Sequence, residues 1–191
     1  CSQKAGDWIF DNKNYQILNN SIDTEIYRFN CESRKRIRQQ YEIDNNCICI
    51  GHVGKIYQPK NHKFLIDIFK DYHSFVKNSK LLLVGDGIMR EDIELYVEEL
   101  SISDSVIFAG MKPNVNEYLS AFDIFVFPSL WEGMPLSVLE AQASGLPCII
   151  SNAIDTDVIA TNIVTMLPLD EGTKAWVERL PEKIEYNREK K

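Results

Sequence analysis

Two glutamates, Glu132 and Glu140, are separated by seven residues and could place two carboxylates at one site. A Gly-Met-Pro turn lies between them, and the apolar run Ile124–Phe127 precedes them, which is typical of a strand, a loop and a helix start. Pro135 suits the first helical position, because an N–H there would have no intrahelical partner. The pattern therefore places Glu132 on a loop at the carboxyl end of a strand and Glu140 inside the following helix.

A ligand that carries both hydroxyl and phosphate groups would suit this arrangement. Carboxylates accept hydrogen bonds from sugar hydroxyls, and the free N–H groups at a helix N-terminus bind phosphate. Ligands of open α/β sheets bind at the carboxyl ends of the strands, where Glu132 is expected. The alternative is that Glu132 is an exposed acid and Glu140 a helix-surface acid, with no ligand at either.

The elements that would position these glutamates follow from the pattern of apolar residues. Nearly continuous apolar runs predict strands covered on both faces at Tyr15–Leu18, Cys47–Ile50, Lys80–Val84, Val106–Phe108, Ile124–Phe127, Cys148–Ile150 and Ile163–Leu167. Amphipathic or capped segments predict helices at Asn61–Phe75, Ile88–Leu100, Asn114–Ala121, Pro135–Ser144 and Glu171–Leu180. Asn114 and Glu117 have the spacing of a capping box. The alternation predicts an α/β fold with a doubly wound parallel sheet.

The ends of the chain differ from this pattern. Residues 1–30 are polar and Asn-rich, which predicts a lead-in before the sheet domain at residues 31–180, and residues 181–191 form a charged tail. The chain begins with Cys1 and not with Met, so we expect a piece of a longer protein.

Two lysines follow the predicted strand Cys47–Ile50 and could bind phosphate. Lys55 comes directly after Gly54, which permits close backbone approach, and Lys60 comes five residues later. Two ammonium groups could clamp a diphosphate as point charges. A glycine turn with solvated lysines is the alternative that this local pattern leaves open.

Glycines also follow the next two predicted strands. Gly85-Asp-Gly87 invites a dinucleotide-binding interpretation, but Arg90 stands where that fingerprint needs its last glycine. Tight-turn glycines are therefore the favoured interpretation. Gly110 and Met111 follow the strand after that, and their backbone could bind a flat base through N–H and C=O groups.

Composition excludes several classes of function. The net charge of −7 argues against a general nucleic-acid binder, which needs clustered lysine and arginine. None of the five cysteines has zinc-ligand spacing, and Cys47, Cys49 and Cys148 lie in apolar runs, as expected for core residues in a reducing compartment. We find neither a signal peptide pattern nor an apolar run of transmembrane length.

Other charged residues receive plain structural interpretations. The three histidines, His52, His62 and His73, are not spaced as a metal site, and His52 is expected on the loop with Lys55. The basic run at Arg34, Arg36 and Arg38 is interpreted as the solvated face of a helix and not as a membrane patch.

Taken together, these loops resemble the C-terminal, nucleotide-sugar-binding domain of retaining GT-B glycosyltransferases. The family 4 group that includes capsule and exopolysaccharide enzymes is the most similar. The resemblance covers about residues 17–170 and rests on motifs after each strand: Gly-His-Val-Gly54-Lys55, Lys60-Asn-His62, Leu-Val-Gly85-Asp-Gly87, Ala-Gly110, Trp-Glu132-Gly-Met-Pro135 and Glu140-Ala-Gln-Ala. It implies a Rossmann-like domain that forms one half of a two-domain GT-B architecture.

The resemblance also implies a role for each motif residue. Lys55 and Lys60, beside Gly54 and Gly85, would hold the donor diphosphate. Glu140 would bind the ribose hydroxyls, and Glu132 would be the catalytic-site residue that faces the donor sugar. The remaining donor-binding positions are backbone contacts, to phosphate or sugar at Gly133, Met134, Pro135, Leu136 and Ser137, and to the base, expected to be uracil, at Gly110 and Met111. Lys55 departs from the family, which more often has arginine there, so the bidentate fork is lost.

The resemblance implies a transferase that moves a sugar from a nucleotide diphosphate to a glycan or lipid-linked acceptor in surface polysaccharide biosynthesis. It implies no metal or other cofactor, an acceptor site on an N-terminal domain, and an inactive isolated fragment. A cytoplasmic location is expected, and peripheral association of the full-length protein with the inner face of the cytoplasmic membrane stays open. A nucleotide-sugar epimerase, a non-catalytic binding module and a nicotinamide-dependent dehydrogenase are the alternatives.

Overall fold

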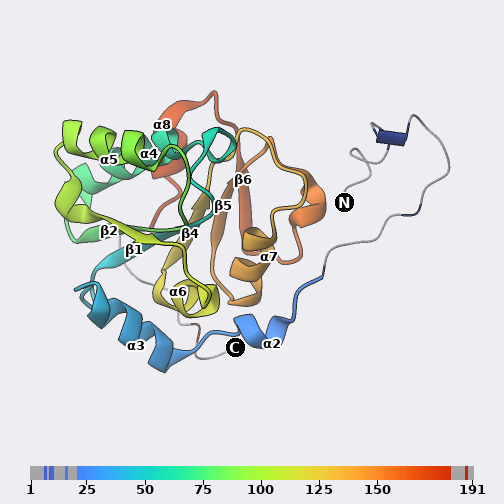
Figure 1. Ribbon diagram of the computed structural model, residues 1–191, viewed down its shortest axis with the longest axis horizontal. Coiled ribbons are helices and arrows are strands. Elements are labelled where there is room, and N and C mark those ends of the chain that lie inside the picture. Colours follow the sequence, from blue (N-terminus) through green and yellow to red (C-terminus); the bar gives the residue numbers. More distant parts are fainter. Residues whose placement is uncertain (1–6, 8, 11–15, 17–20, 182–187, 189–191) are drawn as a thin grey trace.

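The computed structural model describes residues 7, 9, 10, 16, 21–181 and 188, and these form a six-stranded parallel sheet between two layers of helices (Figure 1). The strand order is β3-β2-β1-β4-β5-β6. The bounds are β1 Ile48–Val53, β2 Ser79–Val84, β3 Val106–Gly110, β4 Ile124–Phe127, β5 Cys148–Ser151 and β6 Val164–Leu167. The predicted doubly wound parallel sheet is confirmed; the predicted strand Tyr15–Leu18 lies outside the described residues, apart from Gln16.

The strand order reverses its direction between β1 and β4, which are neighbours in the sheet although they are distant in sequence. The chain winds from β1 through β2 to β3 at one edge, and then returns to β4 beside β1 and continues to β6 at the other edge. The loops after β1 and β4 therefore diverge at the same point of the carboxyl edge. Such a switch point opens the crevice in which this kind of sheet binds its ligand.

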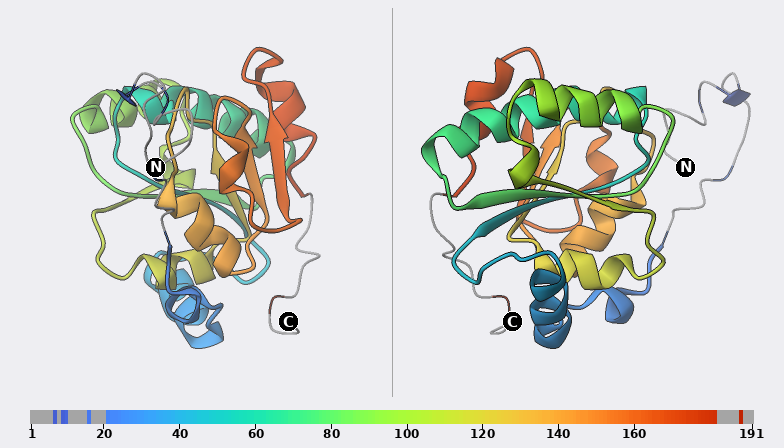
Figure 2. Two further views of the ribbon diagram at one scale, coloured as in Figure 1. Left: turned by 90° about the vertical axis from the view of Figure 1, so that its right-hand side faces the viewer. Right: turned by 60° about the vertical axis from the view of Figure 1, so that its left-hand side comes forward.

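Helices cover the two faces separately, as Figure 2 shows. One face carries α4 His62–Phe75, α5 Arg90–Glu99 and α8 Gly172–Val177, whose Leu65, Ile93 and Trp176 are buried on the sheet. The opposite face carries α3 Cys31–Gln40, α6 Val115–Ala121 and α7 Leu136–Ala143, with the short helix α2 Thr24–Tyr27 packed beside α6 and α7. Three 3-10 turns, η1 Gln58–Lys60, η2 Ser103–Ser105 and η3 Thr156–Val158, complete the connections.

The central strand is longer than its apolar run predicted. β1 continues through Gly51, His52 and Val53, because all six residues pair with β2 and lie buried between the helix layers. Gly51 is needed here for packing, since a Cβ atom on it would lie 1.9 Å from Cδ2 of Phe122. The prediction that His52 lies on a ligand-edge loop was therefore wrong: its imidazole is fully buried in the strand.

Two predictions about helix starts were also wrong. The helix after Glu132 begins at Leu136, one residue later than predicted. Pro135 is its N-cap residue, in extended conformation, and not its first helical residue. Asn114 is an N-cap residue, but its side chain makes no capping hydrogen bond; its amide instead donates to the carboxylate of Glu117. Arg36 also binds that carboxylate, so Glu117 is drawn away from the backbone.

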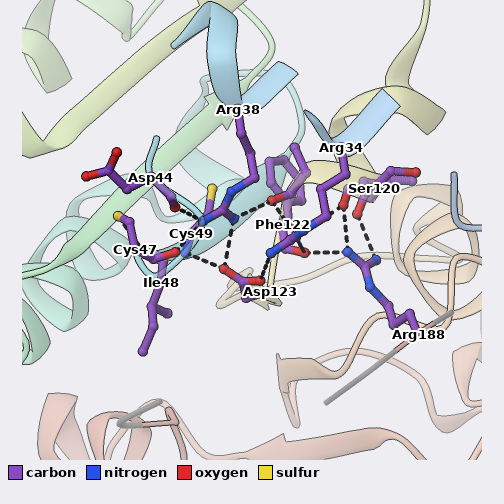
Figure 3. Close-up of polar contacts among 12 residues, drawn as sticks. Arg34, Arg38, Asp44, Cys47, Ile48, Cys49, Ser120, Phe122, Asp123 and Arg188 are labelled. Atoms are coloured by element: carbon purple, nitrogen blue, oxygen red, sulfur yellow. Dashed lines mark hydrogen bonds and ion pairs between the residues drawn. The ribbon is translucent and has the colours of Figure 1, made fainter. Parts of the chain in front are cut away.

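Arg34 and Arg38 of the basic run on α3 face inward, contrary to the solvated face that was predicted (Figure 3), whereas Arg36 is exposed as predicted. Arg38 is 1% exposed and binds Asp123, and Arg34 binds the other oxygen of the same carboxylate at 2.6 Å. Both guanidinium groups also donate to backbone carbonyls where α6 ends, at Ala121. Helix ends leave such carbonyls without intrahelical partners, so α3 and Asp123 fasten the end of α6 to the start of β4.

The thiols of Cys47, Cys49 and Cys148 are buried, as predicted for core residues, and burial raises the pKa of each of them. Within the described part of the chain, no helix combines the length and the apolar character needed to cross a membrane.

Candidate functional site

The loops after β1 and β4 are tied together at the switch point by backbone and side-chain hydrogen bonds. Leu130 N donates to Pro59 O at 2.8 Å, and the Asn61 side chain donates to Pro128 O at 3.1 Å. Asn61 has a left-handed backbone, with φ 56°, because it ends η1 and begins α4 in a single residue. These contacts bring Lys60, the last residue of η1, beside the loop that carries Glu132.

Lys60 and Glu132 form an ion pair at the centre of this junction. The Lys60 Nζ lies 2.7 Å from Glu132 Oε1, and the two side chains are only 10% and 14% exposed. The ammonium also lies 4.3 Å from the centre of the Phe127 ring, in cation–π geometry. Burial lowers the pKa of Lys60, and Glu132 opposes that shift by favouring the charged form. A ligand could therefore separate this poorly solvated pair if its own polar groups took the place of Glu132 at Lys60 and of Lys60 at Glu132.

Gly54 leaves the space in which Lys60 lies. A Cβ atom on Gly54 would lie 3.1 Å from Lys60 Cε and 3.1 Å from His52 Nε2. The backbones of Gly54 and Gly85 also lie close together, because a Cβ atom on Gly85, with φ 141°, would lie 1.9 Å from Gly54 O. Gly85 N in turn donates to Gly110 O at 2.9 Å. Gly54 and Gly85 are therefore close-approach residues, whereas Gly110 is explained by its left-handed backbone, with φ 75°, since a Cβ atom there would come no closer than 3.7 Å, to Arg90 Nη1.

Lys55 does not join the Lys60 pair. Its side chain is exposed, and its Nζ lies 5.7 Å from the centre of the Tyr57 ring. Tyr57 in turn feels the charge of Glu132, because burial and that carboxylate both raise the pKa of the phenol. Lys55 is therefore an exposed charge beside the Tyr57 ring, whereas Lys60 and Glu132 form a largely buried pair.

The N-terminus of α7 adds backbone donors to the loop. Pro135 makes no side-chain cap hydrogen bond, so no capping side chain accepts from the first N–H groups, at Leu136 and Ser137. A Cβ atom on Gly133 would meet nothing within 4 Å, so its backbone borders open space. Met134 packs against the buried core cluster on the α7 face and anchors the turn. An uncapped helix start beside open backbone is suited to an anion.

The remaining predicted positions lie on neighbouring elements. Glu140 lies in the second turn of α7, and its Oε1 accepts a hydrogen bond of 2.8 Å from the Tyr27 hydroxyl. Met111 is 80% exposed beyond the end of β3. Arg90, which breaks the dinucleotide fingerprint, pairs with Glu94 at 2.7 Å and with Asp86 at 3.3 Å. A pocket of about 410 Å³ lies at the other end of α7, beside Ser144 and Gly145, and is lined by none of the predicted donor-binding residues.

A buried imidazole pair that the sequence did not reveal underlies Lys60. His52 Nδ1 lies 2.9 Å from Val126 O, which fixes that nitrogen as the donor and leaves Nε2 as an acceptor. The His62 ring packs edge-on against His52 with 4.8 Å between centroids. Neither His52 Nε2 nor either nitrogen of His62 has a hydrogen-bond partner among residues 21–181 and 188. Burial lowers the pKa of both rings, that of His62 to about 4, and the nearby Lys60 charge lowers both further.

Stability should therefore fall as the solution is acidified. The unfolded chain binds protons on these imidazoles below about pH 6.5, whereas the folded chain does not until the pH approaches the lowered pKa values. The stability that they confer is present above pH 6.5 and is lost between pH 6.5 and about 4. His62 alone should account for about 2 kcal/mol between pH 6.5 and pH 5, since one pKa unit corresponds to about 1.4 kcal/mol.

Urea unfolding at pH 7 and pH 5 measures this effect. In His62→Gln, the unfolded state should bind about one proton fewer at pH 5, so the free energy of unfolding should fall less between pH 7 and pH 5 than in the parent. An unchanged pH dependence in this variant would contradict the buried neutral state of His62.

Comparison with known proteins places these features in a family. Residues 33–186 match the family model described as glycosyl transferases group 1. EpsF of Bacillus subtilis (strain 168), a protein assigned as a glycosyltransferase, is 34% identical over 186 residues, which are 94% of this chain and 48% of that protein. A UDP-Gal:alpha-D-GlcNAc-diphosphoundecaprenol alpha-1,3-galactosyltransferase of Escherichia coli is 27% identical over 176 residues, 88% of this chain and 46% of that enzyme.

A solved structure shares the fold. The crystal structure of Anabaena HepE in complex with UDP-glucose superposes with a TM-score of 0.74 at 18% identity, over 85% of this chain and 46% of that chain. The chain spans about half the length of each of these relatives. The chain therefore belongs to the glycosyl transferases group 1 family and has a Rossmann-like fold.

Proposed function

We propose that this chain is the donor-binding domain of a retaining glycosyltransferase that takes its sugar from a nucleotide diphosphate, with UDP as the nucleotide. The ion pair between Lys60 and Glu132 carries this proposal, because it puts a desolvated cation and a carboxylate beside the uncapped start of α7. HepE has been crystallised with UDP-glucose, and the name of the Escherichia coli relative includes UDP-Gal as donor, which supports a UDP-sugar.

Each group has a distinct task in the proposed mechanism. Lys60 would turn from Glu132 to the diphosphate and, with the N–H groups at the start of α7, offset the charge that builds up on the leaving UDP. Glu132 would then accept hydrogen bonds from the donor sugar and stabilise positive charge near its reacting carbon. Lys55, beside Tyr57, would add a weaker, solvent-exposed charge at the diphosphate. These groups offset the leaving-group charge without a metal ion, and no metal or other cofactor is part of the proposal.

The rest of the reaction would need residues beyond this chain. The acceptor, a glycan or a lipid-linked saccharide of surface polysaccharide such as capsule or exopolysaccharide, would bind through a further domain. The isolated chain should therefore bind UDP without transferring sugar. The full-length protein is proposed to act in the cytoplasm, with peripheral attachment to the inner face of the cytoplasmic membrane as a further proposal.

Titration calorimetry with UDP tests the donor site directly. We expect the chain to bind UDP, and Glu140→Ala to weaken binding about tenfold, because a hydrogen bond to a charged group contributes about 1.5–3 kcal/mol and part of that is recovered by water. Glu98→Ala, on the exposed surface of α5, removes the same charge away from the site and should bind UDP like the parent. Absence of UDP binding by the parent chain would overturn the proposal.

A nucleotide-sugar epimerase of the same fold is the second candidate. Incubation of the full-length protein with UDP-sugars and no acceptor separates the two, since an epimerase would still convert its substrate. We expect no conversion, because the Lys60–Glu132 pair suits a donor whose sugar leaves for an acceptor.

A further inference from the structure

The Tyr27 side chain reaches Glu140 from a part of the chain 113 residues away. Its hydroxyl donates to Glu140 Oε1 at 2.8 Å, and this is the only side-chain hydrogen bond of Glu140 among residues 21–181 and 188. Burial, the hydrogen bond and the charge of Glu140 together raise the pKa of Tyr27 to about 12. The phenol therefore stays protonated and keeps donating throughout the neutral pH range.

The helix that carries Tyr27 is fixed at several points against the same face of the sheet. The Asp23 carboxylate caps α2 by accepting from Glu25 N, and Asn116 of α6 donates to Ile26 O at 3.1 Å. Directly after α2, Asn30 N donates to Ser120 Oγ at 3.1 Å. The Tyr27 ring itself is partly buried and packs against the core cluster on this face of the sheet. The hydroxyl is therefore held in place before any ligand arrives.

A carboxylate on a helix surface rotates about its last side-chain bond, and each orientation presents different lone pairs. One donor that is held on Oε1 selects an orientation in which Oε2 and the remaining lone pair of Oε1 stay open. A vicinal diol, such as that of a ribose, needs two acceptors at one time and is recognised best by a carboxylate that is already oriented.

We infer that Tyr27 is a positioning residue for Glu140 and that it sets the preference of the site for ribose over deoxyribose nucleotides. This inference rests on the proposed function, in which Glu140 binds the ribose. It adds that the selectivity comes in part from α2, which precedes the sheet in sequence, and not from α7 alone. The packing of α2 against α6 and α7 therefore contributes to the selectivity of the site for ribose nucleotides.

Calorimetric titration of the chain with UDP and with 2′-deoxy-UDP tests the inference. The parent should bind UDP more tightly, and the ratio of the two dissociation constants measures ribose selectivity. In Tyr27→Phe, which keeps the partly buried ring, this ratio should fall at least threefold, while the affinity for 2′-deoxy-UDP should change less than twofold. Glu140→Gln should lose selectivity by itself, and adding Tyr27→Phe to it should change the ratio no further.

Tyr41→Phe is the matched control, because the Tyr41 hydroxyl contacts the Tyr118 hydroxyl at 3.2 Å on the same face and does not reach Glu140. It should leave the ratio at the parent value. A parent that binds UDP with a clear preference, combined with an unchanged ratio in Tyr27→Phe, would overturn the role of Tyr27 and leave the proposed function standing. A parent that binds no UDP would overturn both.

Discussion

Lys60→Met is expected to weaken UDP binding by about 100-fold. Methionine keeps the apolar stem that packs beside Gly54 and Phe127, and it removes only the charge. A charge-assisted hydrogen bond contributes about 1.5–3 kcal/mol, and the upper figure applies because the Lys60 side chain is only 10% exposed. The variant also leaves Glu132 without its cation, so an unpaired carboxylate would repel the incoming diphosphate.

Two other lysines calibrate this loss. Lys55→Met should cost about tenfold or less, since Lys55 is exposed and its charge is screened by water. Lys70→Met, on the exposed surface of α4, makes the same change in net charge away from the site and should leave UDP affinity unchanged. Calorimetry on the four proteins gives the ranking, and a Lys60→Met chain that binds UDP within twofold of the parent would exclude Lys60 from the diphosphate site.

The largest effect on folding is expected from Arg38→Met. Arg38 Nη1 donates to Ala121 O and to Asp123, and its Nη2 donates to Asp44 O and Cys47 O. Without Arg38, the Cys47 carbonyl loses the donor at its oxygen, while Ala121 O keeps Arg34 and Asp44 O keeps the Cys47 N–H. The buried Asp123 carboxylate loses one of its two arginine partners and keeps Arg34 and the Cys49 N–H. Removing one member of a buried ion pair typically costs about 3–5 kcal/mol, and the free energy of unfolding should fall by that amount.

Arg36→Met is the control for this change, since it lies on the same helix and removes the same charge. The Arg36 side chain is 57% exposed and pairs with Glu117, and exposed pairs contribute at most about 1 kcal/mol. Urea unfolding of the two variants compares them directly. A loss below about 1 kcal/mol for Arg38→Met would show that the network in Figure 3 does not stabilise the junction of α3, α6 and β4.

Residues whose role depends on near neighbours in sequence could be interpreted correctly from the sequence. The strand at Ile124–Phe127, the loop at Glu132 and the helix that carries Glu140 are each encoded within a few residues, because apolar periodicity and turn residues act locally. The parallel sheet followed from the alternation of such segments. The ends of elements were less accurate: β1 runs three residues past its apolar run, because pairing with β2 continues through Gly51 and His52.

Residues whose role depends on a distant partner could not be interpreted in this way. Arg34 and Arg38 looked like a solvated basic face, since nothing nearby in sequence indicates that Asp123 and the end of α6 would lie against them. The link from Tyr27 to Glu140 spans 113 residues and has no local pattern at all. Lys55 and Lys60 looked equivalent in sequence, yet one is exposed and the other nearly buried.

The sequence by itself determined the class of fold and the kind of groups that stand at the carboxyl edge of the sheet. Only the tertiary structure decided which of these groups are paired, buried and charged. The physical reason is that the reversal of strand order puts the loop after β1 beside the loop after β4. Lys60 and Glu132, 72 positions apart in sequence, meet there in a nearly dry environment, where a single pair of charges acts far more strongly than either would in water.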